Sequence, residues 1–326
     1  MSSLGPVSTD YTTAATAATA ATAATASLTW QRVLAARLSD YAELAKPRIA
    51  VMALVTVAVG YVLAAGDTWS WSGLLHALGG IGLAAVASGA LNQYLERHGD
   101  ARMTRTADRP LPAGRLSGSE VLGVGLASAV VGLGWLAWQV NTITALATAL
   151  TLLLYLAVYT PLKRHTSLAT TVGAVPGALP PVLGWLAAGG PLDSAALSLF
   201  AILFLWQFPH FLAIAWLCRD DYAEAGMKML PRAAARRPGL TGLLGVIYAL
   251  ALLVISAWPR QLGLAGDAYL AAATVLGVGY LVASVRFWWD ESTQTARGVL
   301  YASLIHLPLL LATLTWDHFR LLNCNS

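Results

Sequence analysis

Three side chains that carry oxygen ligands stand four residues apart near the end of a long apolar segment: Asn92, Glu96 and Asp100. Residues at this spacing lie on one face of an α-helix, about one turn apart. Carboxylate and amide oxygens suit Mg²⁺, which keeps coordination positions open for phosphate groups. An ordinary solvated helix end can show the same spacing. Asn92, however, lies in an apolar stretch, where polar groups are costly and usually functional.

Basic side chains follow this cluster. Arg105 and Arg109 lie in the next polar segment and can form forked, charge-assisted hydrogen bonds to a phosphate. Lys163 and Arg164 follow Tyr159 at the end of a later apolar segment. Basic residues beside apolar segments also act as topological signals, which need no set spacing. Taken alone, Lys163 and Arg164 fit that simpler role better.

A second acidic cluster lies between residues 219 and 231. Its members include Arg219, Asp220, Asp221, Tyr222, Glu224 and Lys228. Three carboxylates within five residues repel one another unless a cation or basic partners compensate them. Loops of mixed charge are often merely solvated. Because both clusters place acids beside Arg or Lys, the two together favour a site for Mg²⁺ and a diphosphate.

A proline and a histidine interrupt another apolar segment, at Pro209 and His210. The proline is expected to kink a helix and to free a carbonyl one turn earlier. A single histidine in such a segment is more often a hydrogen-bonded core residue than a ligand. An ionisable residue within a membrane is nevertheless a candidate for function by default. Tyr155, Tyr159 and Trp206 are candidate apolar walls of a cavity.

Membrane helices must position these residues. The 326 residues are 57% hydrophobic and 11% charged, with a mean hydropathy of +0.63. Soluble domains carry roughly 25% charged residues, so a soluble enzyme is excluded. Runs of about 20 apolar residues predict spanning helices, because lipid leaves no other partner for the backbone. Nine segments qualify: 49–66, 73–96, 120–139, 142–160, 168–189, 194–217, 240–258, 268–288 and 298–316.

The basic residues favour one topology. With a cytoplasmic N-terminus, 18 of the 20 Lys and Arg residues fall on the cytoplasmic side, and only Arg260 and Arg320 fall outside. The sequence therefore predicts an all-α polytopic membrane protein, with nine transmembrane helices around a central cavity open to the cytoplasm and with its C-terminus outside. Three prolines in the segment 168–189 predict that this helix is bent or interrupted, as helices beside a cavity can be.

The predicted domain organisation is simple. Residues 1–40 form a low-complexity cytoplasmic tail that is expected to be disordered, residues 41–318 form the nine-helix domain, and residues 319–326 form a short tail. Two long polar loops, 97–119 and 218–239, suggest two similar halves that each offer one loop to a shared cavity. The N-terminal region lacks the Arg-rich character of a mitochondrial transit peptide, which favours a bacterial inner membrane.

The motifs resemble a known family. The pattern Asn92-x-x-x-Glu96-x-x-x-Asp100, followed by Met-x-Arg105-Thr-x-x-Arg109-Pro, resembles the first signature of the intramembrane (UbiA-type) prenyltransferases. The segments 159–164, 207–211 and 219–231 resemble the heme-farnesylating branch of that family, and the likeness runs from about residue 41 to 316.

Two positions depart from the pattern of the wider family. Glu96 stands where an Asp is common. Asp220 and Glu224 keep the spacing of the second acidic motif, whereas Asp221 fits the Asp-Tyr pair of the heme-farnesylating branch. Which of these acids binds the metal stays open.

The resemblance implies a reaction and its residues. It implies Mg²⁺-dependent transfer of a farnesyl group from farnesyl diphosphate to a vinyl group of protoheme IX, which gives heme O, with heme as substrate rather than cofactor. The implied metal ligands are Asn92, Glu96, Asp100, Asp220 and Asp221, and Arg105 and Arg109 join them in catalysis. The implied substrate-binding residues are Tyr159, Lys163, Arg164, His210, Tyr222, Glu224 and Lys228. Lipid and a downstream heme A synthase are implied partners, and no nucleic acid is.

Two other functions share part of this pattern. A prenyltransferase acting on an aromatic acid in quinone biosynthesis would use the same metal and diphosphate chemistry, and the segment from Gln207 to His210 is the feature that speaks against it. A secondary transporter is compatible with broken helices and intramembrane polar groups. It would place its charges near the middle of the membrane, whereas here nearly all charges lie at the cytoplasmic ends of the segments.

Overall fold

The computed structural model describes residues 31–163, 165–224, 226 and 239–325. These residues form helices and no strands, so the predicted all-α class is confirmed. The chain divides into two units, one ending at Glu43 and one beginning at Leu44. The described part of the first unit is helical and exposes three apolar side chains, Val33, Leu34 and Leu38. Residues 31–40 of the segment predicted as a disordered tail are thus helical, and its first 30 residues lie outside the described part.

Eight helical spans in the described ranges are long and apolar enough to cross a membrane. They are Pro47–Thr68 (α2, Pro47–Ala65, and η1), α3 (Trp71–Asp100), α4 (Gly118–Gln139), Thr142–Leu162 (α5, Thr142–Leu153; η2, Leu154–Tyr159; α6, Thr160–Leu162), α9 (Ser194–Leu217), Leu240–Gln261 (α11, Leu240–Ile255; α12, Trp258–Gln261), α13 (Asp267–Trp289) and α14 (Thr293–Asn325). Each corresponds to one predicted segment, so the chain is a multi-pass membrane protein.

The remaining predicted segment, 168–189, is not one continuous helix. It consists of α7 (Ala169–Ala178) and α8 (Pro180–Ala187), separated at Leu179. Prolines lack the amide hydrogen that would continue the helical bonding pattern, and two of them open α8. The predicted interruption is therefore confirmed. Eight of the nine predicted segments thus match spans of the described residues, and the ninth is a broken pair of helices.

The last helix is longer than predicted. α14 begins at Thr293 and continues to Asn325, through the residues that were expected to form a short tail. An ion pair of 2.7 Å between Arg320 and Asp317, one turn apart, and the stacking of Arg320 on Trp316 stabilise its final turns. The predicted C-terminal tail is therefore helical as far as residue 325.

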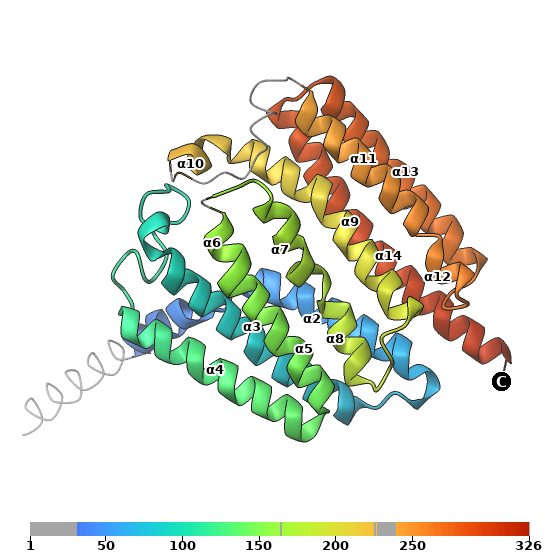
Figure 1. Cartoon of the computed structure of the whole chain (residues 1–326), viewed down its shortest axis with the longest axis horizontal. Helices are drawn as coiled ribbons and strands as arrows, with labels where there is room; N and C mark the ends of the chain where they lie inside the picture. The colour runs from blue at the N-terminus through green and yellow to red at the C-terminus, as the bar shows by residue number, and fades with distance from the viewer. Residues whose placement is uncertain (1–30, 164, 225, 227–238, 326) are drawn as a thin grey trace, which may run out of the picture. The chain divides into compact units, whose positions relative to one another are not determined.

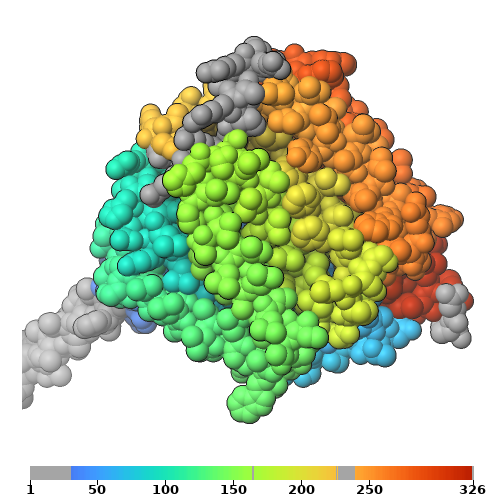
Figure 2. All heavy atoms as spheres, in the orientation of Figure 1, coloured from blue at the N-terminus to red at the C-terminus, as the bar shows by residue number. Residues whose placement is uncertain are grey.

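Within the second unit, the helices pack in two groups (Figure 1). α3 packs on α2, α4 and α5, and α9 packs on α11 and α14, with α13 between α11 and α14. α7 and α8 join the groups, because α7 contacts α9 and α8 contacts α2, α5 and α9. Their surface lies between that of α4 and that of α11 in the space-filling view (Figure 2).

Two glycines allow α2 and α8 to touch backbone to backbone. A Cβ atom at Gly60 of α2 would overlap the carbonyl oxygen of Pro181, and one at Gly184 of α8 would overlap that of Val57. Small residues at helix contacts let backbones approach closely, which is how membrane helices gain packing energy without a hydrophobic driving force. This contact fixes the broken pair against the first group of helices.

Candidate active site

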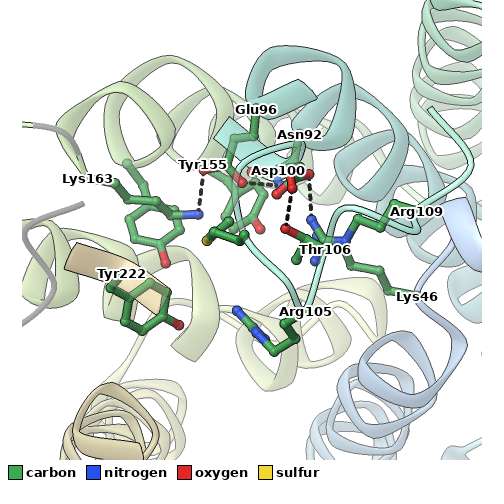
Figure 3. A pocket seen from close by; sticks show the side chains of 12 residues that line it. Lys46, Asn92, Glu96, Asp100, Arg105, Thr106, Arg109, Tyr155, Lys163 and Tyr222 are labelled. Carbon is green, nitrogen blue, oxygen red and sulfur yellow. Dashed lines mark hydrogen bonds and ion pairs between the residues drawn. The ribbon is translucent and has the colours of Figure 1, made fainter. Parts of the chain in front are cut away.

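A polar pocket lies where the end of α3 meets the loop that follows it (Figure 3). Its free volume is about 100 Å³, which is room for a polar head group rather than a long chain. Side chains from the start of α2, from α3, from the loop 101–117, from η2 and α6 and from α10 (Arg219–Glu224) converge on it. The lining residues are Lys46, Asn92, Glu96, Asp100, Met103, Arg105, Thr106, Arg109, Tyr155, Tyr159, Lys163 and Tyr222.

The oxygen-bearing stripe of α3 points into this pocket. Asn92, Glu96 and Asp100 are all buried, with 1%, 7% and 1% of their surface exposed. The Asn92 amide donates a hydrogen bond of 2.8 Å to a Glu96 oxygen. Thr160 of α6 donates one of 3.0 Å to the Asn92 oxygen. The shared helix face that the spacing predicts is thus present in the structure.

Each carboxylate of the stripe has a cationic partner. Lys163 Nζ lies 3.0 Å from Glu96 Oε1, and Arg109 Nη1 lies 2.6 Å from Asp100 Oδ2. Burying a carboxylate without such a partner would be costly. The two ion pairs therefore compensate the charge of the buried carboxylates.

The loop after α3 folds back onto the helix end. Thr106 donates a hydrogen bond of 2.9 Å to the Asp100 carbonyl, and both Thr106 and Met103 are buried. These contacts hold Arg105 and Arg109 over the pocket, as Figure 3 shows. The loop is thus an ordered cover of the site.

Two further cations line the pocket without a carboxylate partner in the described part of the chain, Lys46 and Arg105. The Arg105 guanidinium lies 5.8 Å from the centre of the Tyr222 ring. Burial raises the pKa of the Tyr222 hydroxyl, and the nearby Arg105 opposes this rise. The four cations outnumber the two carboxylates, so the pocket carries a surplus of positive charge that favours an anion.

Lys46 was missed as a site residue in the sequence. Burial, together with the positive charges of Arg109 and Lys163, lowers the pKa of its ammonium to about 8. It caps α2 with φ at 48°, and among the described residues it is the one non-glycine residue with positive φ. Strained backbone of this kind is concentrated at functional sites. Its position directly before Pro47, at the start of a span, was the available signal.

Two tyrosines form the inner wall of the pocket. Tyr155 and Tyr159 lie on the π-helical turn η2, with ring centres 5.3 Å apart. Lys163 Nζ lies 4.4 Å from the centre of the Tyr159 ring. Gly173 of α7 leaves room for that ring, because a Cβ atom there would overlap it. Trp206, which the sequence offered as a third wall residue, packs on His210 instead.

The second acidic cluster enters the pocket through Tyr222 alone, as far as the described residues extend. The side chain of Asp220 is 87% exposed, Glu224 is exposed and Asp221 is partly buried, and none of the three lines the pocket. Arg164 and Lys228 lie outside the described residues. Within those residues, no three His, Cys, Asp or Glu side chains are grouped so as to hold a metal by themselves.

His210 lies apart from the pocket lining. It belongs to α9, which continues through Pro209, and its Nδ1 lies 2.7 Å from the hydroxyl of Ser303 on α14. Gln207, one turn earlier, donates to the Ala174 carbonyl of α7 at 3.2 Å. This segment of α9 therefore forms side-chain hydrogen bonds to α14 on one side and to α7 on the other.

Comparisons with known proteins show the family of the chain. Residues 53–307 match the model of the UbiA prenyltransferase family. A protoheme IX farnesyltransferase of Solibacter usitatus is 43% identical over 295 residues, which cover 86% of this chain and 99% of that protein.

Solved structures share the fold. A digeranylgeranylglyceryl phosphate synthase aligns with a TM-score of 0.73 at 14% identity, over 87% of this chain and 99% of that one. A UbiA homologue of Archaeoglobus fulgidus, bound to GPP and Mg²⁺, aligns with a TM-score of 0.63 at 16% identity, over 85% and 99%. The chain belongs to the UbiA prenyltransferase family.

Proposed function

We propose that this chain transfers a farnesyl group from farnesyl diphosphate to a vinyl group of protoheme IX and so forms heme O. One observation carries the diphosphate half of the proposal: Lys46 and Arg105 line a pocket beside two buried carboxylates and have no acidic partner of their own in the described residues. The acceptor is proposed from the protoheme IX farnesyltransferase that is 43% identical over nearly its whole length.

The donor set of the pocket fits Mg²⁺. Asn92, Glu96 and Asp100 offer amide and carboxylate oxygens on one face of α3, and such hard ligands leave open positions for phosphate. Lys163 and Arg109 now pair with the two carboxylates, so Mg²⁺ would bind together with the negatively charged diphosphate, which supplies the charge that the pocket lacks. When bound, Mg²⁺ would neutralise the negative charge that develops on a departing diphosphate. Asp220 and Asp221 stay proposed as further ligands from the second cluster.

The cations of the pocket would hold the diphosphate. Arg105 and Arg109 can donate paired hydrogen bonds to phosphate oxygens, and Lys46 and Lys163 act as compact charges. These bonds strengthen as the carbon–oxygen bond of the farnesyl group breaks and charge accumulates on the leaving oxygen. Tyr222 would orient Arg105, over whose guanidinium its ring lies.

The farnesyl cation that remains needs walls that neither react with it nor admit water. The rings of Tyr155 and Tyr159 lie beside the ion pairs and present π faces, which attract positive charge. In the proposed reaction, the terminal carbon of the vinyl group attacks the cation. Water then adds to the adjacent carbon and loses a proton, which leaves a hydroxyl group there.

The pocket also suits a cytoplasmic entrance. Lys46, the loop 101–117, Lys163 and α10 all belong to segments that the distribution of basic residues assigns to the cytoplasmic side. We propose a multi-pass protein of the inner membrane with a cytoplasmic N-terminus and with its C-terminus outside. A heme A synthase that takes up the product is the proposed partner.

The test offers two acceptors to the same membranes. Purified protein in lipid receives farnesyl diphosphate and Mg²⁺ with protoheme IX, with 4-hydroxybenzoate, or with both, and products are separated by chromatography. We expect a farnesylated, hydrated heme and no prenylated benzoate. Prenylation of the aromatic acid alone would reject the proposal. Pigment analysis of membranes from a host that lacks heme O, with and without this gene, gives the same answer in cells.

A further inference from the structure

The hydrogen bonds around His210 fix which of its nitrogens carries the proton. His210 Nδ1 lies 2.7 Å from Ser303 Oγ, and the same Oγ donates to the Leu300 carbonyl at 2.6 Å. A serine hydroxyl has a single proton to donate. Because Leu300 receives that proton, Ser303 can only accept from His210. His210 therefore carries its proton on Nδ1, and Nε2 keeps a free lone pair.

Neighbouring contacts hold the imidazole ring in this position. The Trp206 ring stacks on it with centres 5.1 Å apart and planes 21° apart. The Trp206 indole donates to the Ser303 carbonyl at 3.0 Å, and Tyr280 of α13 donates to the Trp206 carbonyl at 3.2 Å. Contacts from α9 and α14 thus hold the imidazole ring in one orientation.

The Nε2 atom has no hydrogen-bond partner in the described residues, and the His210 ring is partly exposed. His306, one turn after Ser303 on α14, provides a contrast because its ring is sealed at 1% exposure. A histidine that binds a metal usually donates its other N–H to a fixed acceptor, which sets the tautomer and the ring orientation. His210 has that arrangement, because its Nδ1–H is directed at the fixed hydroxyl of Ser303.

We infer that His210 Nε2 is an axial ligand to the iron of the porphyrin acceptor, and that Ser303 is the positioning residue that keeps this nitrogen unprotonated. The inference rests on the proposed function, since it assigns the acceptor side of the same enzyme. It places the acceptor beside α9 and α14.

The test measures heme binding apart from turnover. Ferric protoheme IX is titrated into wild-type protein in lipid, and the Soret band is recorded. We expect a histidine-ligated spectrum that is lost in His210→Gly and restored by added imidazole. Ser303→Ala should weaken heme binding about tenfold, since changes to partners of metal ligands typically cost 10–100-fold, and Ser303→Thr should restore it. The affinity for farnesyl diphosphate, measured without heme, should stay unchanged in all three.

Three results would overturn the inference. One is a wild-type Soret band in His210→Gly without imidazole. Another is loss of the band in His306→Leu while the His210 variant keeps it. The third is an equal loss of affinity for metal-free protoporphyrin IX in His210→Gly, because ligation requires the iron. Glu96→Gln should retain the band and lose turnover. If wild-type protein farnesylates heme while any of these three results appears, the ligand assignment fails and the proposed function stands.

Discussion

Lys163 and Glu96, which are 67 residues apart in the chain, form an ion pair of 3.0 Å that joins the end of α6 to the face of α3. The pair links the last turns of α3 to the end of α6, and both of these segments line the pocket. Both side chains are largely buried, with 11% and 9% exposed, so the interaction is little screened by solvent. A substitution of either residue therefore leaves a buried charge without its partner, and this must be considered when the variant is tested for function.

Glu96→Gln should abolish most of the activity and leave the fold intact. The amide keeps the size of the side chain and can accept from Lys163, but it is a poorer ligand for Mg²⁺. We expect kcat to fall by about 100-fold or more, as for the loss of one stabilising group in a transition state. Asp108→Asn in the following loop is the control, because Asp108 is 99% exposed and pairs with Arg115. Equal activity of the two variants would contradict the assignment.

Arg105 and Arg109 should differ when each is replaced by Ala. Loss of Arg105 removes a cation that no acid in the described residues pairs with, so we expect a rise of about tenfold or more in KM for farnesyl diphosphate and an unchanged melting temperature. Loss of Arg109 also strands Asp100, which is 1% exposed, so it should lower the melting temperature as well.

The double variant Arg109→Ala with Asp100→Asn isolates this second effect. It removes the stranded charge, so thermal stability should recover while activity stays lost. Thermal unfolding in detergent and steady-state kinetics measure the two effects. A stable Arg109→Ala single variant would show that the ion pair contributes little.

The charge of Lys46 should make diphosphate binding depend on pH. Its pKa is lowered to about 8, so the ammonium is charged below that pH and is lost as pH rises through it. We expect the affinity for inorganic pyrophosphate, relative to that of Lys46→Arg, to fall above about pH 8. The arginine stays charged throughout and is the matched control. Parallel pH profiles of the two proteins, measured by calorimetry, would exclude the role.

Gly184→Ala should destabilise the protein without changing the residues that line the pocket. The added methyl group would overlap the Val57 carbonyl of α2, and overpacking of this kind costs about 1–3 kcal/mol. Gly134→Ala on α4 is the control, since nothing lies within 4 Å of its added Cβ. Thermal unfolding should separate the two variants by several degrees, and equal stability would show that α2 and α8 can separate freely.

The acids of the second cluster should contribute unequally. Asp221 is partly buried next to Tyr222, which lines the pocket, whereas Asp220 and Glu224 are exposed. We expect Asp221→Asn to lower kcat more than Asp220→Asn or Glu224→Gln. The Mg²⁺ dependence of turnover measures the difference. A larger effect of Asp220→Asn would favour the other spacing in this motif.

Much of the fold followed from patterns that need no tertiary information. Long apolar runs predicted the spans within a few residues, and the prolines of residues 168–189 predicted the break. The i, i+4 spacing of Asn92, Glu96 and Asp100 predicted a shared face, because that relation is local to one helix.

Relations between distant segments could not be predicted in this way. The pairing of Lys163 with Glu96 depends on how α3 and α6 pack, and a charge beside a span looks the same whether it faces a pocket or the lipid head groups. Lys46 could not be recognised as a site residue from the sequence for the same reason. The partner of His210 on α14 lies 93 residues away, so nothing near the histidine signals it.

The left-handed backbone of Lys46 has a consequence for how far the protein could be stabilised. Such a conformation costs a non-glycine residue about 1–2 kcal/mol, and the ammonium stands among like charges. In the unfolded chain the Lys46 ammonium keeps its proton up to a pH near 10.5. The free energy of unfolding of the ligand-free protein should therefore increase as pH rises from about 8 toward that value. Lys46→Gly would remove both the backbone strain and the charge repulsion. A screen for thermal stability would therefore select this variant, although it lacks a cation that binds the diphosphate.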